Sequence, residues 1–71
     1  MKDIDLIKVR NNLRAYRIAC GYTQDDVAEI LQVTKRTVSN YECHPENLDI
    51  AKLNSLGKLY GVHPKEFFCG S

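Results

Sequence analysis

The 71-residue sequence predicts a compact all-α domain of five short helices. Apolar residues recur at spacings of three and four, which places them on one face of a helix. Thr or Asp precedes several of these segments as an N-cap, and Gly or Pro follows them. No segment alternates apolar and polar residues as a strand would. We expect a single domain over residues 1–71, with its core at about 6–68 and a frayed tail at 69–71.

The first helix is expected from about residue 6 to residue 20. One apolar stripe recurs along it at helical spacing and should face the core: Val9, Leu13, Tyr16 and Cys20. Gly21 suits the position that ends the helix, where a left-handed residue is common.

Two N-caps eleven residues apart mark the second and third helices. Thr23 followed by Asp26 predicts a capping box, in which the hydroxyl and the carboxylate each accept a backbone N–H. Thr34 offers the second N-cap, so one helix should cover 24–31 and the next about 35–43. The short turn between them forces a steep crossing, the helix-turn-helix geometry that presents a helix to the DNA major groove.

Apolar residues should hold the crossing of these two helices. Ala28 lies where they cross, and a side chain larger than a methyl group would push them apart. The other inward residues of this segment are Val27, Leu31, Val33, Val38 and Tyr41.

The fourth helix is expected to begin after Asp49, its N-cap, and to end at Gly61. Its inward face is predicted to consist of Ile50, Leu53, Leu56 and Tyr60. Gly57 lies inside this helix at a cost of about 1 kcal/mol relative to alanine, which indicates close approach of a neighbouring segment.

A short fifth helix should begin at Pro64, because proline is favoured at the first helical position. His63 is expected at its N-cap. Phe67 and Phe68 follow, and they either close the core or supply an apolar surface for a second copy of the chain.

Charge is unevenly distributed, although the net charge is only +1. Between residues 6 and 24 every charged residue is basic: Lys8, Arg10, Arg14 and Arg17. Lys35 and Arg36 add a second basic point, and the acidic residues gather elsewhere. A nearly neutral protein can in this way present one positive face.

Other site classes are not expected. Three cysteines are widely spaced and form no Cys-x-x-Cys pair: Cys20, Cys43 and Cys69. His44 and His63 make no ligand cluster with them, so we expect reduced thiols, no metal and no cofactor. No apolar run approaches the ~18 residues of a membrane span, and residues 1–8 lack a signal-peptide core. We therefore expect a soluble, cytoplasmic protein without membrane contact.

The outer face of the third predicted helix suits DNA. Its outward residues can all hydrogen-bond and none is acidic: Lys35, Arg36, Thr37, Ser39 and Asn40. Two cations in the first turn oppose the helix dipole at about 0.3–1 kcal/mol each, a cost that a phosphate or a guanine edge would reverse. Lysine or arginine suits guanine O6 and N7, and asparagine suits adenine N6 and N7. The alternative is that both cations lie on a solvated surface.

A longer pattern in the chain resembles a known family. It comprises Leu13-Arg14, Arg17, Gly21-Tyr22-Thr23-Gln24, Val27-Ala28, Leu31-Gln32-Val33-Thr34, Val38-Ser39, Tyr41-Glu42, Leu59-Tyr60-Gly61-Val62 and Phe67-Phe68. With this pattern, residues 12–68 resemble the phage-repressor/Cro type of helix-turn-helix DNA-binding domain. The resemblance implies a five-helix lambda-repressor-like fold whose third helix enters the major groove.

The resemblance also implies residue roles. Base edges would be contacted by Lys35, Arg36, Asn40 and Ser39. Backbone phosphates would be contacted by Gln24, Thr37, Arg14 and Asn47, and Arg10 could join them. Arg17 and Glu42 match positions that form a partly buried ion pair between the first and third helices, a structural role.

Two departures from the family pattern stand out. Gln32 occupies a turn position that is often glycine, so a positive φ there would add strain of roughly 1 kcal/mol. The loop 43–48 is often basic in the family, but here it contains one acid and no lysine or arginine. Fewer phosphate contacts imply weaker DNA binding with a shallower salt dependence.

Two functions are compatible with these features. The first is a sequence-specific transcriptional regulator, such as a phage or mobile-element repressor, that binds DNA as a homodimer through the fifth helix (Phe67, Phe68). The second is an antitoxin-like or adaptor module that binds proteins and retains the fold with weak or no DNA binding. An enzyme or a small-molecule site is not expected, because no nucleophile–base pair, carboxylate dyad or phosphate loop is present.

Overall fold

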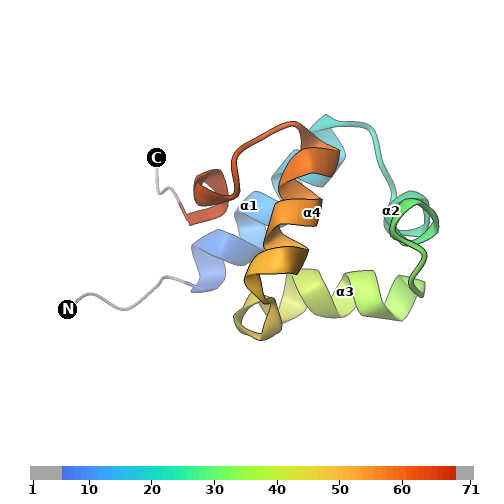
Figure 1. Cartoon of the computed structure of the whole chain (residues 1–71), viewed down its shortest axis with the longest axis horizontal. Coiled ribbons are helices and arrows are strands. Elements are labelled where there is room, and N and C mark those ends of the chain that lie inside the picture. Colours follow the sequence, from blue (N-terminus) through green and yellow to red (C-terminus); the bar gives the residue numbers. More distant parts are fainter. Residues whose placement is uncertain (1–5, 69–71) are drawn as a thin grey trace.

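Four α-helices and two 3₁₀ helices make up residues 6–68, the part of the chain that the computed structural model describes (Figure 1). They are α1 (Leu6–Ala19), α2 (Gln24–Leu31), α3 (Lys35–Cys43), η1 (Pro45–Asn47), α4 (Ile50–Tyr60) and η2 (Pro64–Phe68). The all-α prediction is confirmed, but the count of five helices is not. The tail predicted at 69–71, with Cys69, lies outside the described residues.

The predicted fifth helix is the 3₁₀ helix η2, and a second 3₁₀ helix, η1, occupies part of the predicted loop 43–48. In η2, the Glu66 N–H donates to the His63 carbonyl at 2.8 Å. In η1, the Leu48 N–H donates to the Pro45 carbonyl at 3.0 Å. Both segments begin with proline and are too short for many i→i+4 bonds, so the tighter i→i+3 pattern satisfies more of their backbone groups.

The predicted helix starts are confirmed. Thr23 and Asp26 form a full capping box, with bonds of 3.0 and 2.9 Å. Thr34 Oγ1 accepts the Thr37 N–H at 3.1 Å, and Asp49 Oδ1 accepts the Lys52 N–H at 2.8 Å. The bonds from Lys52 hold the pKa of Asp49 below its ordinary value. Local sequence therefore sets where these helices begin.

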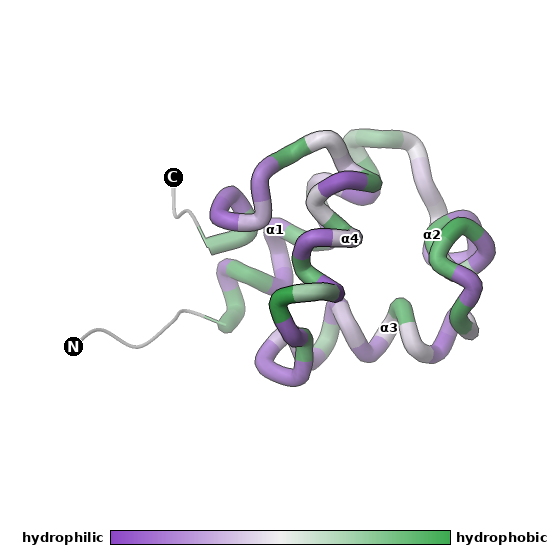
Figure 2. The backbone as a smooth tube through the Cα atoms, viewed as in Figure 1, coloured by the Kyte–Doolittle hydropathy of each residue, from purple (hydrophilic) through white to green (hydrophobic). Residues whose placement is uncertain are grey.

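All four α-helices and η2 contribute to the core. Apolar and polar stretches alternate along each helix, as burial of one face requires (Figure 2). The buried apolar residues are Val9, Leu13, Val27, Ala28, Val38, Leu56, Tyr60 and Phe67. Tyr16 and Tyr60 meet the Phe67 ring edge-on, with centroids 5.9 and 6.3 Å away. Burial raises the pKa of the Tyr60 hydroxyl above its ordinary value.

Two residues predicted to face inward do not. Ile50, the first residue of α4, is 74% exposed. Cys20 lies just past the end of α1 and is exposed, although its thiol lies within hydrogen-bond distance (3.5 Å) of the Tyr60 carbonyl. Helical spacing predicts on which face of a helix a residue lies, but not how far along the helix the core extends.

Gly57 allows the close approach that the sequence predicts. A Cβ at this position would lie 2.7 Å from the Val62 carbonyl oxygen and 3.2 Å from the ring of Pro64. The segment leading into η2 therefore packs directly on the backbone of α4, and this brings Phe67 onto the core.

Gln32 ends α2 in the left-handed conformation, with φ 59° and ψ 45°. Glycine adopts this conformation without the Cβ strain that other residues incur. We expect Gln32→Gly to leave the free energy of unfolding unchanged or to raise it by up to about 1 kcal/mol, because the greater freedom of glycine in the unfolded chain offsets part of the gain.

Thermal denaturation followed by circular dichroism measures this effect. Glu29→Gly, at an exposed position inside α2, is the control and should destabilise by about 1 kcal/mol. A clear fall in melting temperature for Gln32→Gly would contradict the expected relief of strain.

Candidate nucleic-acid interface

A three-residue turn fixes the relation between α2 and α3. The Val33 N–H donates to the Ala28 carbonyl at 2.9 Å, and Thr34 caps the next helix. In Figure 1, α2 is seen almost end-on while α3 lies across the view, so the two helices cross steeply. Val38 and Ala28 are buried at this crossing. The opposite side of α3 is left for solvent or a partner.

The outer face of α3 carries the residues predicted to contact bases. Lys35, Arg36 and Asn40 are exposed, and Ser39 is half-buried. Thr37 is also half-buried, and its hydroxyl shares a 2.9 Å hydrogen bond with that of Thr34. The outer face of α3 therefore presents exposed hydrogen-bond donors. The Thr37 hydroxyl, predicted to contact a phosphate, is already hydrogen-bonded to Thr34.

Asp25 faces Lys35, a contact that the sequence reasoning missed. Lys35 Nζ lies 3.9 Å from Asp25 Oδ2, and the two side chains are 62% and 72% exposed. Such an exposed pair contributes little to stability, so Lys35 stays free to exchange this partner for a DNA acceptor. Two features of the sequence could have indicated this contact. Asp25 lies in the first turn of α2, and the N-cap at Thr34 places Lys35 in the first turn of α3.

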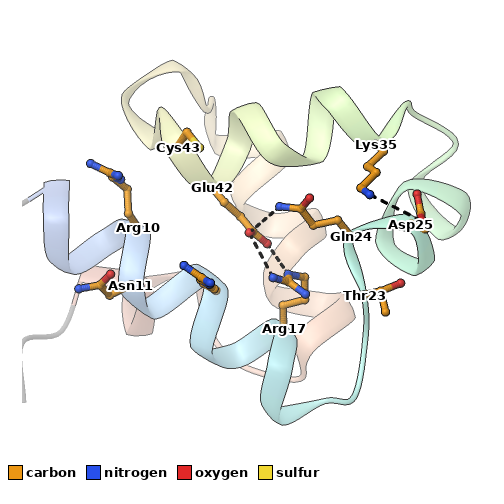
Figure 3. A pocket seen from close by; sticks show the side chains of 10 residues that line it. Arg10, Asn11, Arg17, Thr23, Gln24, Asp25, Lys35, Glu42 and Cys43 are labelled. Carbon is orange, nitrogen blue, oxygen red and sulfur yellow. Dashed lines mark hydrogen bonds and ion pairs between the residues drawn. The ribbon is translucent and has the colours of Figure 1, made fainter.

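Arg17 and Glu42 form an ion pair between α1 and α3 (Figure 3). Arg17 Nε lies 2.6 Å from Glu42 Oε2, and the side chains are only 11% and 10% exposed. Arg17 Nη1 also donates to the Tyr22 carbonyl at 2.9 Å. The guanidinium thus ties α3 both to α1 and to the chain entering α2.

Gln24 completes this network. Its Nε2 donates to Glu42 Oε1 at 3.1 Å, so the carboxylate accepts from two different helices. This bond uses one of the two N–H groups of the amide, and the other is left for an external acceptor such as a phosphate. The sequence did not reveal that Glu42 holds Gln24 as well as Arg17.

A groove of about 490 Å³ runs along this network between α1 and α3 (Figure 3). Its lining residues are Arg10, Asn11, Arg14, Arg17, Thr23, Gln24, Asp25, Lys35, Glu42 and Cys43. Four of them are cations and two are carboxylates. The groove brings Arg14, Gln24 and Lys35 together, whereas Arg36, Asn40 and Asn47 lie outside it.

The loop after α3 offers few donors. Asn47 is exposed at the end of η1, but its backbone N–H already donates to the His44 carbonyl at 3.0 Å. His44 Nδ1 lies 3.4 Å from Glu46 Oε2, and both side chains are partly exposed. The side chain of Asn47 remains a candidate phosphate contact from this loop.

Phe67 and Phe68, expected either to close the core or to supply a dimer surface, have different environments. Phe67 is fully buried, and its carbonyl accepts the Asn12 side-chain N–H at 2.9 Å, so it closes the core. Phe68 is 44% exposed. The apolar surface that η2 offers to a partner is therefore smaller than the sequence suggested.

Neither a metal-binding cluster of side chains nor a membrane-spanning helix is found within residues 6–68. No group of three or more His, Cys, Asp or Glu side chains within this range is placed to hold a metal ion. None of the helices in the same range combines the length and apolarity that crossing a bilayer requires.

A family model described as helix-turn-helix, of the Cro/C1 type, matches residues 13–67. The match covers α1 from Leu13, the whole of α2, α3 and α4, and η2 up to Phe67. It therefore includes the turn, the ion pair and most of the groove described above. Comparison with curated proteins and with solved structures gave no match.

Proposed function

Since the chain belongs to the helix-turn-helix family of Cro/C1-type DNA-binding regulators, we propose that it is a sequence-specific transcriptional repressor of a phage or mobile element. It acts in the cytoplasm, where it places α3 in the major groove of its operator. The observation that carries this proposal is the outer face of α3, which is rich in donors and lacks an exposed carboxylate from Lys35 to Asn40.

Base readout is assigned to the exposed side chains of α3. Lys35 and Arg36, in the first turn, suit the guanine O6 and N7 acceptors, and Asn40 suits adenine N6 and N7. Ser39, one turn after Lys35, contacts a thymine methyl or a phosphate. The steep crossing with α2 supports this assignment because it leaves this face of α3 uncovered by the rest of the fold.

Phosphate contacts are assigned to residues that flank this face. They are Gln24, Thr37, Arg14 and Asn47. Gln24 is supported by its remaining amide N–H and by its place at the first turn of α2, where backbone N–H groups favour an anion. Such contacts position α3 on the duplex without discriminating between sequences.

A homodimer is part of the proposal because one α3 contacts only a few base pairs. Two copies would bind half-sites about one helical turn apart. Phe68 is the dimer contact, since Phe67 is committed to the core. Phe68→Ala should then shift the protein towards monomer in sedimentation velocity, and an unchanged distribution would remove η2 as the dimer surface.

Base and backbone roles are separated by two alanine variants. Asn40→Ala should cost about 1–3 kcal/mol on the preferred site and relax preference at one base position, whereas Gln24→Ala should weaken binding to all sequences alike. A selection of bound sites from random duplexes, repeated with each variant, measures both effects. Equal and uniform losses for the two variants would contradict the division between base and phosphate contacts.

An antitoxin-like or adaptor module that binds proteins is the second candidate. It is favoured by the loop from Cys43 to Leu48, which has no lysine or arginine and contains Glu46. The test is binding to mixed-sequence duplex DNA at low salt. No binding at micromolar protein and about 50 mM salt would favour this second function, because non-specific affinity rises steeply as salt falls.

A further inference from the structure

Asp25 is the solvent-facing carboxylate of the groove between α1 and α3. Two carboxylates line this groove, those of Asp25 and Glu42. Glu42 is only 10% exposed and accepts from Arg17 and Gln24, whereas the Asp25 side chain is 72% exposed. An anion that enters the groove from solvent therefore meets the charge of Asp25 directly.

The capping of α2 does not account for where the Asp25 side chain lies. Thr23 and Asp26 form the capping box, and the Asp25 carboxylate takes no part in it. The helix dipole favours an acid in the first turn, but this effect does not require a particular orientation of the side chain. In the structure Asp25 faces Lys35 across the turn between the two helices, with Oδ2 3.9 Å from Nζ (Figure 3). Asp25 therefore acts on the first proposed base contact of α3.

This pair affects Lys35 differently for the two kinds of acceptor that DNA offers. Guanine O6 and N7 are neutral, and a lysine ammonium has three N–H groups. Lys35 can thus donate to both guanine atoms and keep Asp25 as the partner of its third N–H. A phosphate is anionic, and a phosphate bound to Lys35 would lie close to the Asp25 carboxylate. Like charges at such a separation repel each other, so Lys35 binds a phosphate only at the expense of its pair with Asp25.

Phosphates are expected close to this pair in any bound duplex. Gln24, the residue before Asp25, is proposed to contact one, and Arg14 of the same groove is proposed to contact another. A duplex without the operator sequence is held almost entirely by its phosphates. In such a complex Lys35 has little to gain from base edges, and the repulsion between Asp25 and phosphate has its largest effect.

We propose that Asp25 is a specificity-determining residue, which opposes the binding of phosphates by Lys35 and leaves Lys35 available for a neutral guanine edge. Asp25 therefore lowers the affinity for non-specific DNA more than the affinity for the operator. This inference rests on the proposed DNA-binding function. It adds a residue of α2 to those of α3 that determine which DNA is bound.

Asp25→Asn tests the inference, because it removes the charge and nearly preserves the size of the side chain. Fluorescence anisotropy gives Kd for two labelled duplexes, one of mixed sequence and one recovered by selection from random duplexes. At about 50 mM salt the variant should bind the mixed duplex roughly fivefold more tightly than wild type. Its Kd for the recovered duplex should stay within about twofold of wild type, because the guanine edge is neutral. The ratio of the two Kd values, which measures specificity, should fall accordingly.

The salt dependence of Kd provides a second readout. On the mixed duplex, the slope of log K against log salt should be steeper by about 0.9 for Asp25→Asn, because Lys35 gains one phosphate. The advantage of the variant over wild type should then shrink roughly three- to fourfold between about 50 and 200 mM salt. A merely structural role of Asp25 would not change this slope.

Two controls separate the pair from net charge. Glu29→Gln removes a carboxylate from an exposed residue of α2 that does not line the groove, and should leave the specificity ratio unchanged. In a Lys35→Gln background, Asp25→Asn should lose most of its effect on the mixed duplex, because the cation that Asp25 restrains is absent. Circular dichroism should show melting temperatures within a few degrees of wild type, because the three replaced side chains are exposed.

The outcomes also separate this inference from the proposed function. An unchanged specificity ratio for Asp25→Asn, or a gain that persists in full in the Lys35→Gln background, would overturn the role of Asp25. The proposed function would still stand if wild-type protein binds duplex DNA and Asn40→Ala changes its sequence preference. If neither wild-type protein nor Asp25→Asn binds any duplex at about 50 mM salt, both are wrong.

Discussion

Replacing Phe67 by alanine should lower the free energy of unfolding by about 3–5 kcal/mol, the usual cost of truncating a fully buried phenylalanine. Phe67 has no exposed surface, and its ring packs edge-on against Tyr16 and Tyr60. The alanine variant loses both ring contacts and leaves a cavity between α1 and α4. Because a domain of this size has only about 5–15 kcal/mol of stability, we expect much of the variant to be unfolded at 37 °C.

Chemical denaturation followed by circular dichroism measures this loss. Phe68→Ala is the matched control, since it removes the same side chain from the next residue, where 44% of the surface is exposed. It should change the free energy of unfolding by much less than Phe67→Ala. Similar losses for the two variants would show that the contribution of these two side chains to stability does not follow their burial.

The contrast between these two phenylalanines shows where sequence reasoning reaches its limit. Pro64 marked the start of the segment correctly, because proline restricts its own φ and lacks an N–H whatever surrounds it. Whether Phe67 or Phe68 enters the core depends on how far the segment rotates as it packs on Gly57 of α4. That rotation follows from tertiary contacts, and a 3₁₀ helix differs from an α-helix in the faces it presents.

The helix starts and the turn could be predicted from the sequence, because their signals do not depend on tertiary contacts. Thr23, Thr34 and Asp49 each satisfy the backbone N–H group three residues ahead, so their signal is local. The family resemblance pointed to Gln32 as a turn position where φ could be positive, and its φ is 59°. Together they determine where α3 begins and which of its faces is outward.

The candidate site could be predicted only in part from the sequence. The residues of α3 could be placed by periodicity, and the pairing of Arg17 with Glu42 came from the family resemblance. The bonds from Gln24 to Glu42 and from Lys35 to Asp25 join side chains of different helices. Their distances depend on the crossing angle, which depends on packing at Ala28 and Val38, and periodicity does not supply it.

Glu42→Ala should be the other strongly destabilising variant, with a loss of about 3–5 kcal/mol in the free energy of unfolding. The carboxylate accepts from Arg17 Nε at 2.6 Å and from Gln24 Nε2 at 3.1 Å, and both members of the ion pair are about nine-tenths buried. Its removal leaves the Arg17 guanidinium with little solvent and without its counter-charge. Urea denaturation measures the loss.

Two comparisons test whether burial of the unpaired charge is the cause. Asp25→Ala breaks the exposed 3.9 Å pair with Lys35 in the same groove, and should cost less than about 1 kcal/mol. Arg17→Met combined with Glu42→Leu removes both charges and should be more stable than Glu42→Ala alone, because apolar side chains of similar volume need no partner. If the double variant instead loses as much stability as Arg17→Met and Glu42→Leu lose in sum, the destabilisation comes from lost packing and not from an uncompensated guanidinium. Since Glu42 also holds Gln24, the alanine variant should bind all DNA sequences more weakly even where it remains folded.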